Sequence, residues 1–152
     1  MGPLPLLDVN GLEVLDRAEC LARLSRGGVG RLGFVGADSA LAILPVNFTV
    51  WGDEIVIRTR RGGTIHRIGE SGAAVAFEID ELDPAYHGGR SVLVRGHARL
   101  LTDTRDPPAG AALPPAWAND DADVLVAVST EELTGRRIPH RSQADLRDRS
   151  RT

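Results

Sequence analysis

The chain has 152 residues, which is enough for one domain with a hydrophobic core of its own. Hydrophobic residues make up 42% of it and no apolar run approaches the ~20 residues of a membrane helix, so we expect a soluble cytoplasmic protein without an export signal. A net charge of -3, with the basic residues scattered among 21 acidic ones, argues against nucleic-acid binding and leaves small molecules as the expected partners.

Residue usage also excludes several kinds of chemistry. All 18 basic residues are arginines, so mechanisms that need a lysine amine, such as a Schiff base or a P-loop lysine, are ruled out. Cys20 is the single cysteine and cannot form an internal disulfide or a thiolate metal cluster. The histidines have no metal-binding spacing and no serine lies in a nucleophile elbow, so we expect neither a metal site nor a hydrolase.

A short amphipathic helix is the first predicted element. Asp16 and Glu19 have the spacing of a capping box, in which each side chain accepts a hydrogen bond from the other residue's backbone. Cys20 and Leu24 then fall on one face of the helix. Gly27 and the glycine after it end the element, where a left-handed residue is wanted.

Most of the remaining chain has the character of short antiparallel strands. The predicted strands cover residues 29–35, 40–50, 54–60, 73–80, 91–101 and 123–130. A short helix is predicted at 64–70, a surface loop at 103–115, and a polar tail at 139–152 that we expect to be disordered. Because an open sheet of this size would leave its edges exposed, the strands predict a closed or nearly closed barrel.

The letters at 28–33, GVGRLG, match the GxGxxG pattern of dinucleotide-binding proteins. In those proteins a strand precedes the glycines and a helix follows, so that the phosphate meets a helix N-terminus. Here a predicted helix precedes the pattern and a strand follows it. We therefore interpret these glycines as a helix end leading into a glycine-containing strand.

An anion site is one of two interpretations of the segment at 55–68, IVIRTRRGGTIHRI. Its strand places Arg58 and Arg60 on the face opposite Ile57, away from the barrel interior. A glycine turn and a helix start follow, and the backbone donors of Gly63 and Thr64 could bind a phosphate together with the guanidinium groups. The other interpretation, a solvated basic turn, is equally open on the residues alone.

Several segments, in this order and spacing, carry a family resemblance that covers about residues 12–138. They are the capped helix followed by GGVGRLGFV, LPVNFTVWGDEIVIRTRRGG, FEID, SVLVRGHARLL and VSTEELTGRRI. This chain resembles the pyridoxamine 5′-phosphate oxidase-like flavoproteins, in particular their small actinobacterial members. The resemblance implies a mainly β fold, a six-stranded antiparallel split β-barrel with short flanking helices. It also implies one flavin-binding domain at 1–138 and the tail at 139–152.

The resemblance further implies a homodimer with FMN at the subunit interface. The isoalloxazine ring would lie against the second strand, where main-chain groups would meet it. Its expected contacts are Pro45, Val46, Asn47 and Phe48 for the ring, Arg58, Thr59, Arg60, Gly63 and Thr64 for the phosphate, and Arg90 and Ser91 nearby. Trp117 and Arg136 are expected to contact the substrate from the partner subunit.

One departure from the family pattern lies in the phosphate turn. Relatives commonly have a basic residue after Gly-Ser, whereas this chain has Gly62-Gly63-Thr64, so Arg60, Arg61 or Arg67 would have to supply the missing contact. The resemblance implies an FMN-dependent oxidoreductase, close to flavin and nitro reductases, that acts on a small molecule through the flavin alone, without a catalytic side chain. The alternative is a non-catalytic carrier or sensor that binds a flavin, a deazaflavin or haem.

Overall fold

The computed structural model describes residues 2, 4–101, 107–117 and 122–139. Within these residues the chain forms eight strands and only two short helices, so the prediction of a mainly β fold is confirmed. The strands are β1 (Glu13–Leu15), β2 (Gly28–Val35), β3 (Leu41–Trp51), β4 (Glu54–Thr59), β5 (Ala74–Asp83), β6 (Gly88–Leu100), β7 (Val124–Val128) and β8 (Glu132–Ile138). The helices are α1 (Arg17–Leu24) and α2 (Thr64–Ser71).

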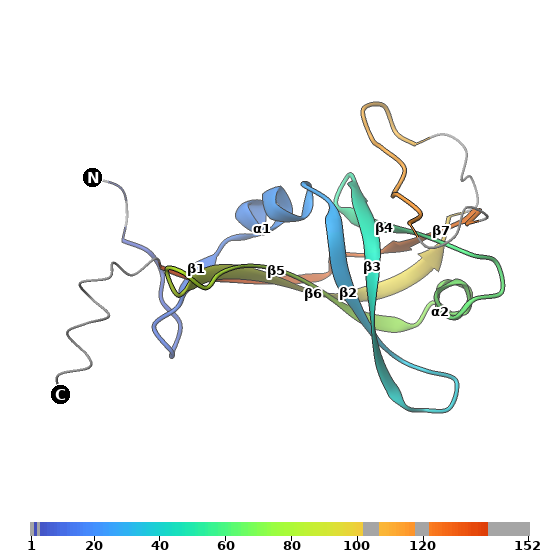
Figure 1. Cartoon of the computed structure of the whole chain (residues 1–152), viewed down its shortest axis with the longest axis horizontal. Helices are drawn as coiled ribbons and strands as arrows, with labels where there is room; N and C mark the ends of the chain where they lie inside the picture. Colours follow the sequence, from blue (N-terminus) through green and yellow to red (C-terminus); the bar gives the residue numbers. More distant parts are fainter. Residues whose placement is uncertain (1, 3, 102–106, 118–121, 140–152) are drawn as a thin grey trace.

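Six of the strands close into an antiparallel barrel, as predicted. The order around it is β6-β5-β2-β3-β4-β7, and β7 returns to pair with β6. In Figure 1 the barrel forms the right part of the molecule, and α2 lies beside its strands. Closure removes the unpaired sheet edges that would otherwise face water.

A second sheet region extends from the barrel because β6 is long enough to change partners. Its last residues, Ala98–Leu100, pair with β7, whereas Gly89–Arg95 pair with β8, and β8 pairs with β1. We call the outer part of this region the wing; it consists of residues 79–83 of β5, residues 88–92 of β6, β8 and β1. Figure 1 shows the wing running to the left, with α1 lying over it.

The core fills the barrel interior and continues beneath α1. Phe48 and Phe77 meet edge to face with ring centroids 4.9 Å apart, and both rings are buried. Gly30 packs directly against this pair, because a Cβ at that position would lie 2.1 Å from Cζ of Phe77. The glycine pattern at 28–33 therefore lies in a barrel strand, which confirms that it is not a dinucleotide-binding turn.

The predicted start of helix α1 is confirmed, because the capping box is formed. The Asp16 side chain accepts from the backbone of Glu19, and the Glu19 side chain accepts from the backbone of Asp16. Gly27 and Gly28 have φ of 65° and 119°, the left-handed conformations expected after the helix. Neither described helix is long and apolar enough to cross a membrane.

Two strands were missed by the sequence interpretation, β1 and β8. β8 is the segment ELTGRRI, in which only Gly135 is fully buried, so it lacks the apolar alternation that marks a strand. Residues 107–115 of the predicted loop contain no helix or strand. The first residues of the predicted loop, 103–106, lie outside the described residues. So does nearly all of the predicted tail, residues 140–152.

Candidate functional site

Strand β3 has one backbone edge that no described strand covers along residues 41–47. It pairs with β2 along Leu41–Phe48, but with β4 only along Phe48–Trp51. Successive residues of a strand direct their N–H and C=O groups to alternate edges. Between Leu41 and Asn47, every second residue therefore offers its backbone groups to the open edge. The predicted ring contacts, Pro45 to Phe48, lie at the point where β4 diverges.

The side chains of these four residues divide between the two faces of the sheet. Val46 and Phe48 point into the barrel and are buried, whereas Pro45 and Asn47 are on the outer face. The side-chain Oδ1 of Asn47 is buried and has no hydrogen-bond partner among the described residues. An unpaired buried acceptor costs free energy, so this atom marks a place suited to a donor.

Helix α2 begins at the predicted glycine turn and has an uncapped N-terminus. Gly63 is the N-cap residue and supplies no side-chain acceptor, and the first turn contains no acidic residue. Gly62 has φ of 76°, in the left-handed region that favours glycine. The first backbone N–H groups of a helix have no intrahelical partner, so this turn presents donors that suit an anion.

His66 holds the turn in place and was not predicted as part of the site. Its Nδ1 accepts a hydrogen bond from the backbone N–H of Gly62 at 3.0 Å, and its side chain is buried. The neighbouring Arg67 donates from its guanidinium to the carbonyl oxygen of Gly62 at 2.7 Å. The signal available in the sequence was the i,i+4 spacing of Gly62 and His66, which alone predicts no contact between a loop and a helix.

The arginines of this region are engaged to different degrees. Arg58 lies on the outer face of β4 as predicted, and its Nε donates to the carbonyl oxygen of Ala122 at 2.6 Å. Arg61 pairs with Asp123 at 3.6 Å. Arg60 is exposed and has no acidic partner in the described part of the chain. Arg58 therefore has one donor occupied by the backbone, whereas no acidic side chain among the described residues pairs with Arg60.

A groove joins the open part of the β2–β3 hairpin to α2. Its volume is about 640 Å³, within the range of small-molecule sites. The hairpin contributes Ala42 and Leu44 of β3, and α2 contributes Thr64 and Arg67. Of the residues predicted to contact the flavin, Thr64 lines this groove, whereas the predicted ring contacts Pro45 to Phe48 follow Leu44 along β3 and do not line it.

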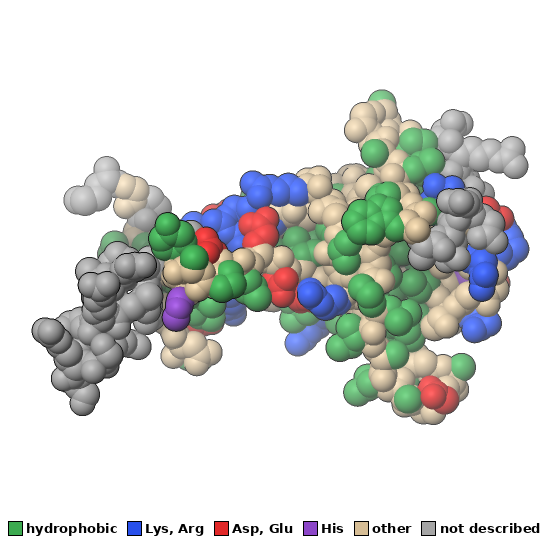
Figure 2. Space-filling view, viewed as in Figure 1, with side chains coloured by type: hydrophobic (Ala, Val, Ile, Leu, Met, Phe, Trp, Pro, Cys, Tyr) green, Lys and Arg blue, Asp and Glu red, His purple; other side chains and the backbone are tan. Residues whose placement is uncertain are grey.

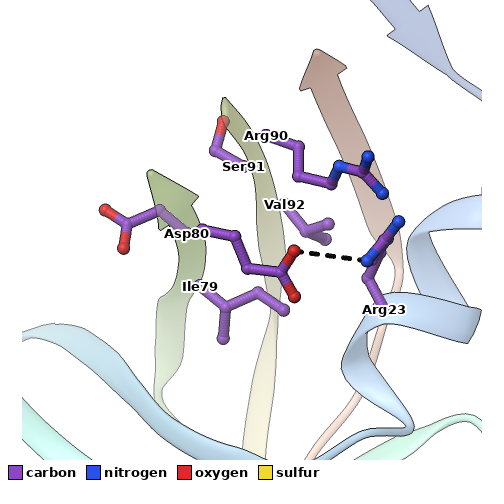
Figure 3. Close-up of a pocket in the computed structure, with 7 residues that line it drawn as sticks. Arg23, Ile79, Asp80, Arg90, Ser91 and Val92 are labelled. Carbon is purple, nitrogen blue, oxygen red and sulfur yellow. Dashed lines mark hydrogen bonds and ion pairs between the residues drawn. The ribbon is translucent and has the colours of Figure 1, made fainter. Parts of the chain in front are cut away.

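Arg90 and Ser91 lie elsewhere, on the wing. They border a small pocket between β5, β6 and α1, which Figure 3 shows. As consecutive strand residues they point to opposite faces of the sheet. In Figure 1 the wing and α2 are at opposite sides of the barrel. Within one chain, these two residues are therefore not brought to the groove.

The two predicted substrate residues are also separate from the groove. Trp117 is 78% exposed at the end of the described segment 107–117. Arg136 lies on β8, where its Nε donates to Asp8 Oδ2 at 2.8 Å. A backbone hydrogen bond from Leu12 holds the pKa of Asp8 below its usual value, and the Arg136 guanidinium adds to this effect.

A cluster of three polar side chains on the outer face of the barrel, those of His97, Ser129 and Glu131, was not predicted. His97 Nδ1 lies 2.8 Å from Oε1 of Glu131, and the Ser129 hydroxyl donates to the same oxygen at 2.8 Å. These two hydrogen bonds hold the pKa of Glu131 below its usual range. Because the serine binds the carboxylate and not the imidazole, the three groups are not in the order of a hydrolytic triad.

No group of three or more metal-ligating side chains occurs within residues 4–101, 107–117 and 122–139.

Comparisons with known proteins agree with this architecture. The family model described as pyridoxamine 5′-phosphate oxidase matches residues 16–137. An uncharacterised protein of Mycobacterium tuberculosis, Rv0080, is 34% identical over 128 residues, covering 82% of this chain and 84% of that protein.

Two solved structures of other actinobacteria are similar over most of the chain. The FAD-binding protein of Mycobacterium smegmatis is 28% identical with a TM-score of 0.61, covering 84% of this chain and 99% of that one. A provisionally assigned pyridoxamine 5′-phosphate oxidase of Corynebacterium glutamicum is 25% identical with a TM-score of 0.69, covering 94% of this chain and 100% of that one.

Proposed function

Because the chain belongs to the pyridoxamine 5′-phosphate oxidase family, we propose that it binds a flavin nucleotide, FMN, and acts as a flavin-dependent oxidoreductase on a small molecule. The observation that carries this proposal is the groove between the β2–β3 hairpin and α2, whose N-terminus is uncapped. The start of α2 offers donors for an anion, and the open edge of β3, which continues from Leu44, offers backbone hydrogen-bonding groups. The similarity to an FAD-binding protein supports a flavin as the ligand.

The phosphate end of the flavin fits the turn at the start of α2. The backbone donors of this turn have no side-chain cap, and no carboxylate in the first turn would repel an anion. Arg67 follows at the fourth position of the helix and lines the same groove, so its guanidinium can supply the charge that relatives take from a basic residue at position 64. His66 fixes Gly62 and thereby the shape of the turn.

The ring end fits the open edge of β3. A flavin ring carries both acceptors and an N–H donor, which match backbone N–H and C=O groups on this edge and the unpaired Oδ1 of Asn47. When bound, the flavin supplies the hydride or electron chemistry itself. The residues of this chain bind it, orient it against β3 and exclude water from one face.

We also propose that two copies of the chain pair. The outer face of the β2–β3 hairpin exposes apolar side chains that a lone chain leaves in water: Val35 is 57%, Ile43 71% and Leu41 85% exposed. These residues share one face, since Val35 opposes Leu41 and Gly33 opposes Ile43 in the strand register. Figure 2 shows apolar side chains gathered along β2 and β3. A contiguous patch of this kind is typical of an interface.

Pairing of two chains would also explain why several predicted site residues lie away from the groove within one chain. Ser91, Trp117 and Arg136 would contact the flavin or its substrate only if a partner subunit brought them to the groove. The same holds for Arg90 if it contacts the flavin. The complete site would then require both copies, as the family resemblance implies.

The test is titration of flavin-free protein with FMN and with FAD, followed by flavin fluorescence. Arg67→Ala should weaken FMN binding by about 1.5–3 kcal/mol, or roughly ten- to a hundredfold in Kd. Arg95→Ala is the matched control, because Arg95 pairs with Glu132 at 3.3 Å and does not line the groove. Equal FMN affinity in the Arg67 variant and the wild type would show that the phosphate lies elsewhere.

A turnover assay distinguishes an oxidoreductase from a non-catalytic flavin carrier. If the FMN-bound protein passes electrons from NADH or NADPH to a nitroaromatic or quinone acceptor, it is an oxidoreductase. A flavin that binds tightly but supports no turnover with either donor would favour the carrier alternative.

A further inference from the structure

Two arginine side chains converge in the wing, and the carboxylate of Glu81, which lines the same pocket, is bonded to Arg23 and not to Arg90. Arg90 extends from β6 and Arg23 from α1, and Figure 3 shows their guanidinium groups pointing toward one another. Arg23 is largely enclosed, with 22% of its side chain exposed. Two like charges brought together in a partly desolvated place are unfavourable unless an anion lies between them.

The acids near Arg90 are already engaged. Its cross-strand neighbour on β5 is Glu81, which pairs with Arg23 and with Arg26 at 3.2 Å each. Its neighbour on β8 is Arg137, whose own partner is Glu13 of β1. Arg90 itself has no acidic partner in the described part of the chain. Its charge is therefore uncompensated.

The charged side chains around Arg90 carry a positive excess that favours an anion. Four guanidinium groups and two carboxylates lie on this face of the wing or on α1 above it, so two positive charges are in excess. The guanidinium groups are those of Arg23, Arg26, Arg90 and Arg137, and the carboxylates those of Glu13 and Glu81. Asp80, the next acid on β5, belongs to the opposite face of the sheet and pairs with Arg31 at 3.5 Å.

The floor of the pocket is apolar and has little room. Ile79 and Val92 line it beneath the two arginines. Guanidinium groups bind oxyanions strongly because each offers several donors in a fixed plane, and the apolar side chains keep water from one side of these two arginines. The pocket has a volume of only about 10 Å³, room for no more than a water molecule, so a compact anion would lie over the two guanidinium groups at its mouth and not inside it.

We propose that Arg23 and Arg90 form a binding site for a small oxyanion, the carboxylate or phosphate group of a small-molecule ligand, between α1 and the wing. The site belongs to a single chain and needs neither the flavin nor a second copy. It gives Arg90 a role different from the flavin contact that the family resemblance implies, and the two roles are separable by experiment.

The experiment measures binding of inorganic phosphate and of acetate to the purified protein, with any bound flavin retained, by calorimetry at constant ionic strength in chloride. We expect saturable binding of at least one of the two anions and at least a tenfold loss of affinity in Arg90→Gln. Arg95→Gln, an arginine of the same strand that is paired with Glu132, should bind as the wild type does.

A variant with increased affinity keeps the test valid if the Arg90 variant loses binding only because it misfolds. Glu81→Gln removes the acid that competes for Arg23, so it should tighten anion binding severalfold. Loss of phosphate binding in Arg67→Gln but not in Arg90→Gln would place the anion at α2 and overturn the proposal. So would wild-type protein that binds neither anion, or a Glu81→Gln variant whose affinity is unchanged or weaker.

Discussion

Replacing Gly30 by alanine tests how tightly the barrel is closed around its aromatic core. The added Cβ would lie 2.1 Å from Cζ of Phe77, so reaching an ordinary contact of 3.4 Å requires a displacement of about 1.3 Å. Phe77 is completely buried and packs against Phe48, which leaves no space for that movement. Overpacking of this kind costs about 2–3 kcal/mol, toward the upper end of the usual range.

Gly33→Ala is the matched control on the same strand. A Cβ there meets only Ala76, at 3.7 Å from its oxygen, so the stability should change by less than about 0.5 kcal/mol. The assay is chemical and thermal unfolding, where the expected loss for Gly30→Ala corresponds to about 4–12 °C in Tm. A Gly30 variant as stable as the wild type, or a Gly33 variant equally damaged, would refute this account of β2.

Three further predictions concern the site and the surface. His66→Ala should lower stability by about 1–2 kcal/mol and weaken FMN binding, because Gly62 loses its acceptor; unchanged FMN titrations would contradict this. Glu131 has a depressed pKa in the folded protein, so its contribution to stability is full above its unfolded pKa of about 4.3 and is lost as pH falls through the folded value. Glu131→Gln should therefore flatten the acid side of the stability–pH profile, and an unaltered slope would refute the His97 contact. Ile43→Glu places a charge in the exposed apolar face and should convert a dimer into monomers in sedimentation velocity, whereas an unchanged mass would place the interface elsewhere.

Local rules predicted the barrel strands and both helices because their signals are carried by neighbouring residues. Asp16 and Glu19 satisfy each other within one helical turn, and Gly63 marks the start of α2. Strands with an apolar inner face, such as β2 and β6, alternate clearly in burial. β8 could not be found this way, because it is stabilised by β6 and β1 on its two edges and not by an apolar pattern of its own.

The candidate site was predictable only where its parts are close in sequence. The glycine turn and the start of α2 follow from composition and spacing, and the structure places Arg58 on the predicted face. The contact between His66 and Gly62 depends on how the turn folds back onto the helix, which no periodicity reveals. The separation of Arg90 from Thr64 depends on the length of β6, because α2 packs near the end of β6 that pairs with β7, whereas Arg90 lies near the end that pairs with β8. Long-range placement of this kind comes from strand pairing and cannot be derived from local propensity.

The most direct measurement is mass spectrometry of the small molecule that leaves the protein when it is denatured after purification without added cofactor. We expect FMN in an amount close to one molecule per chain, with a matching flavin absorbance before denaturation. Protein that releases no flavin and gives no signal when FMN or FAD is added back would contradict the assignment of the groove between β3 and α2.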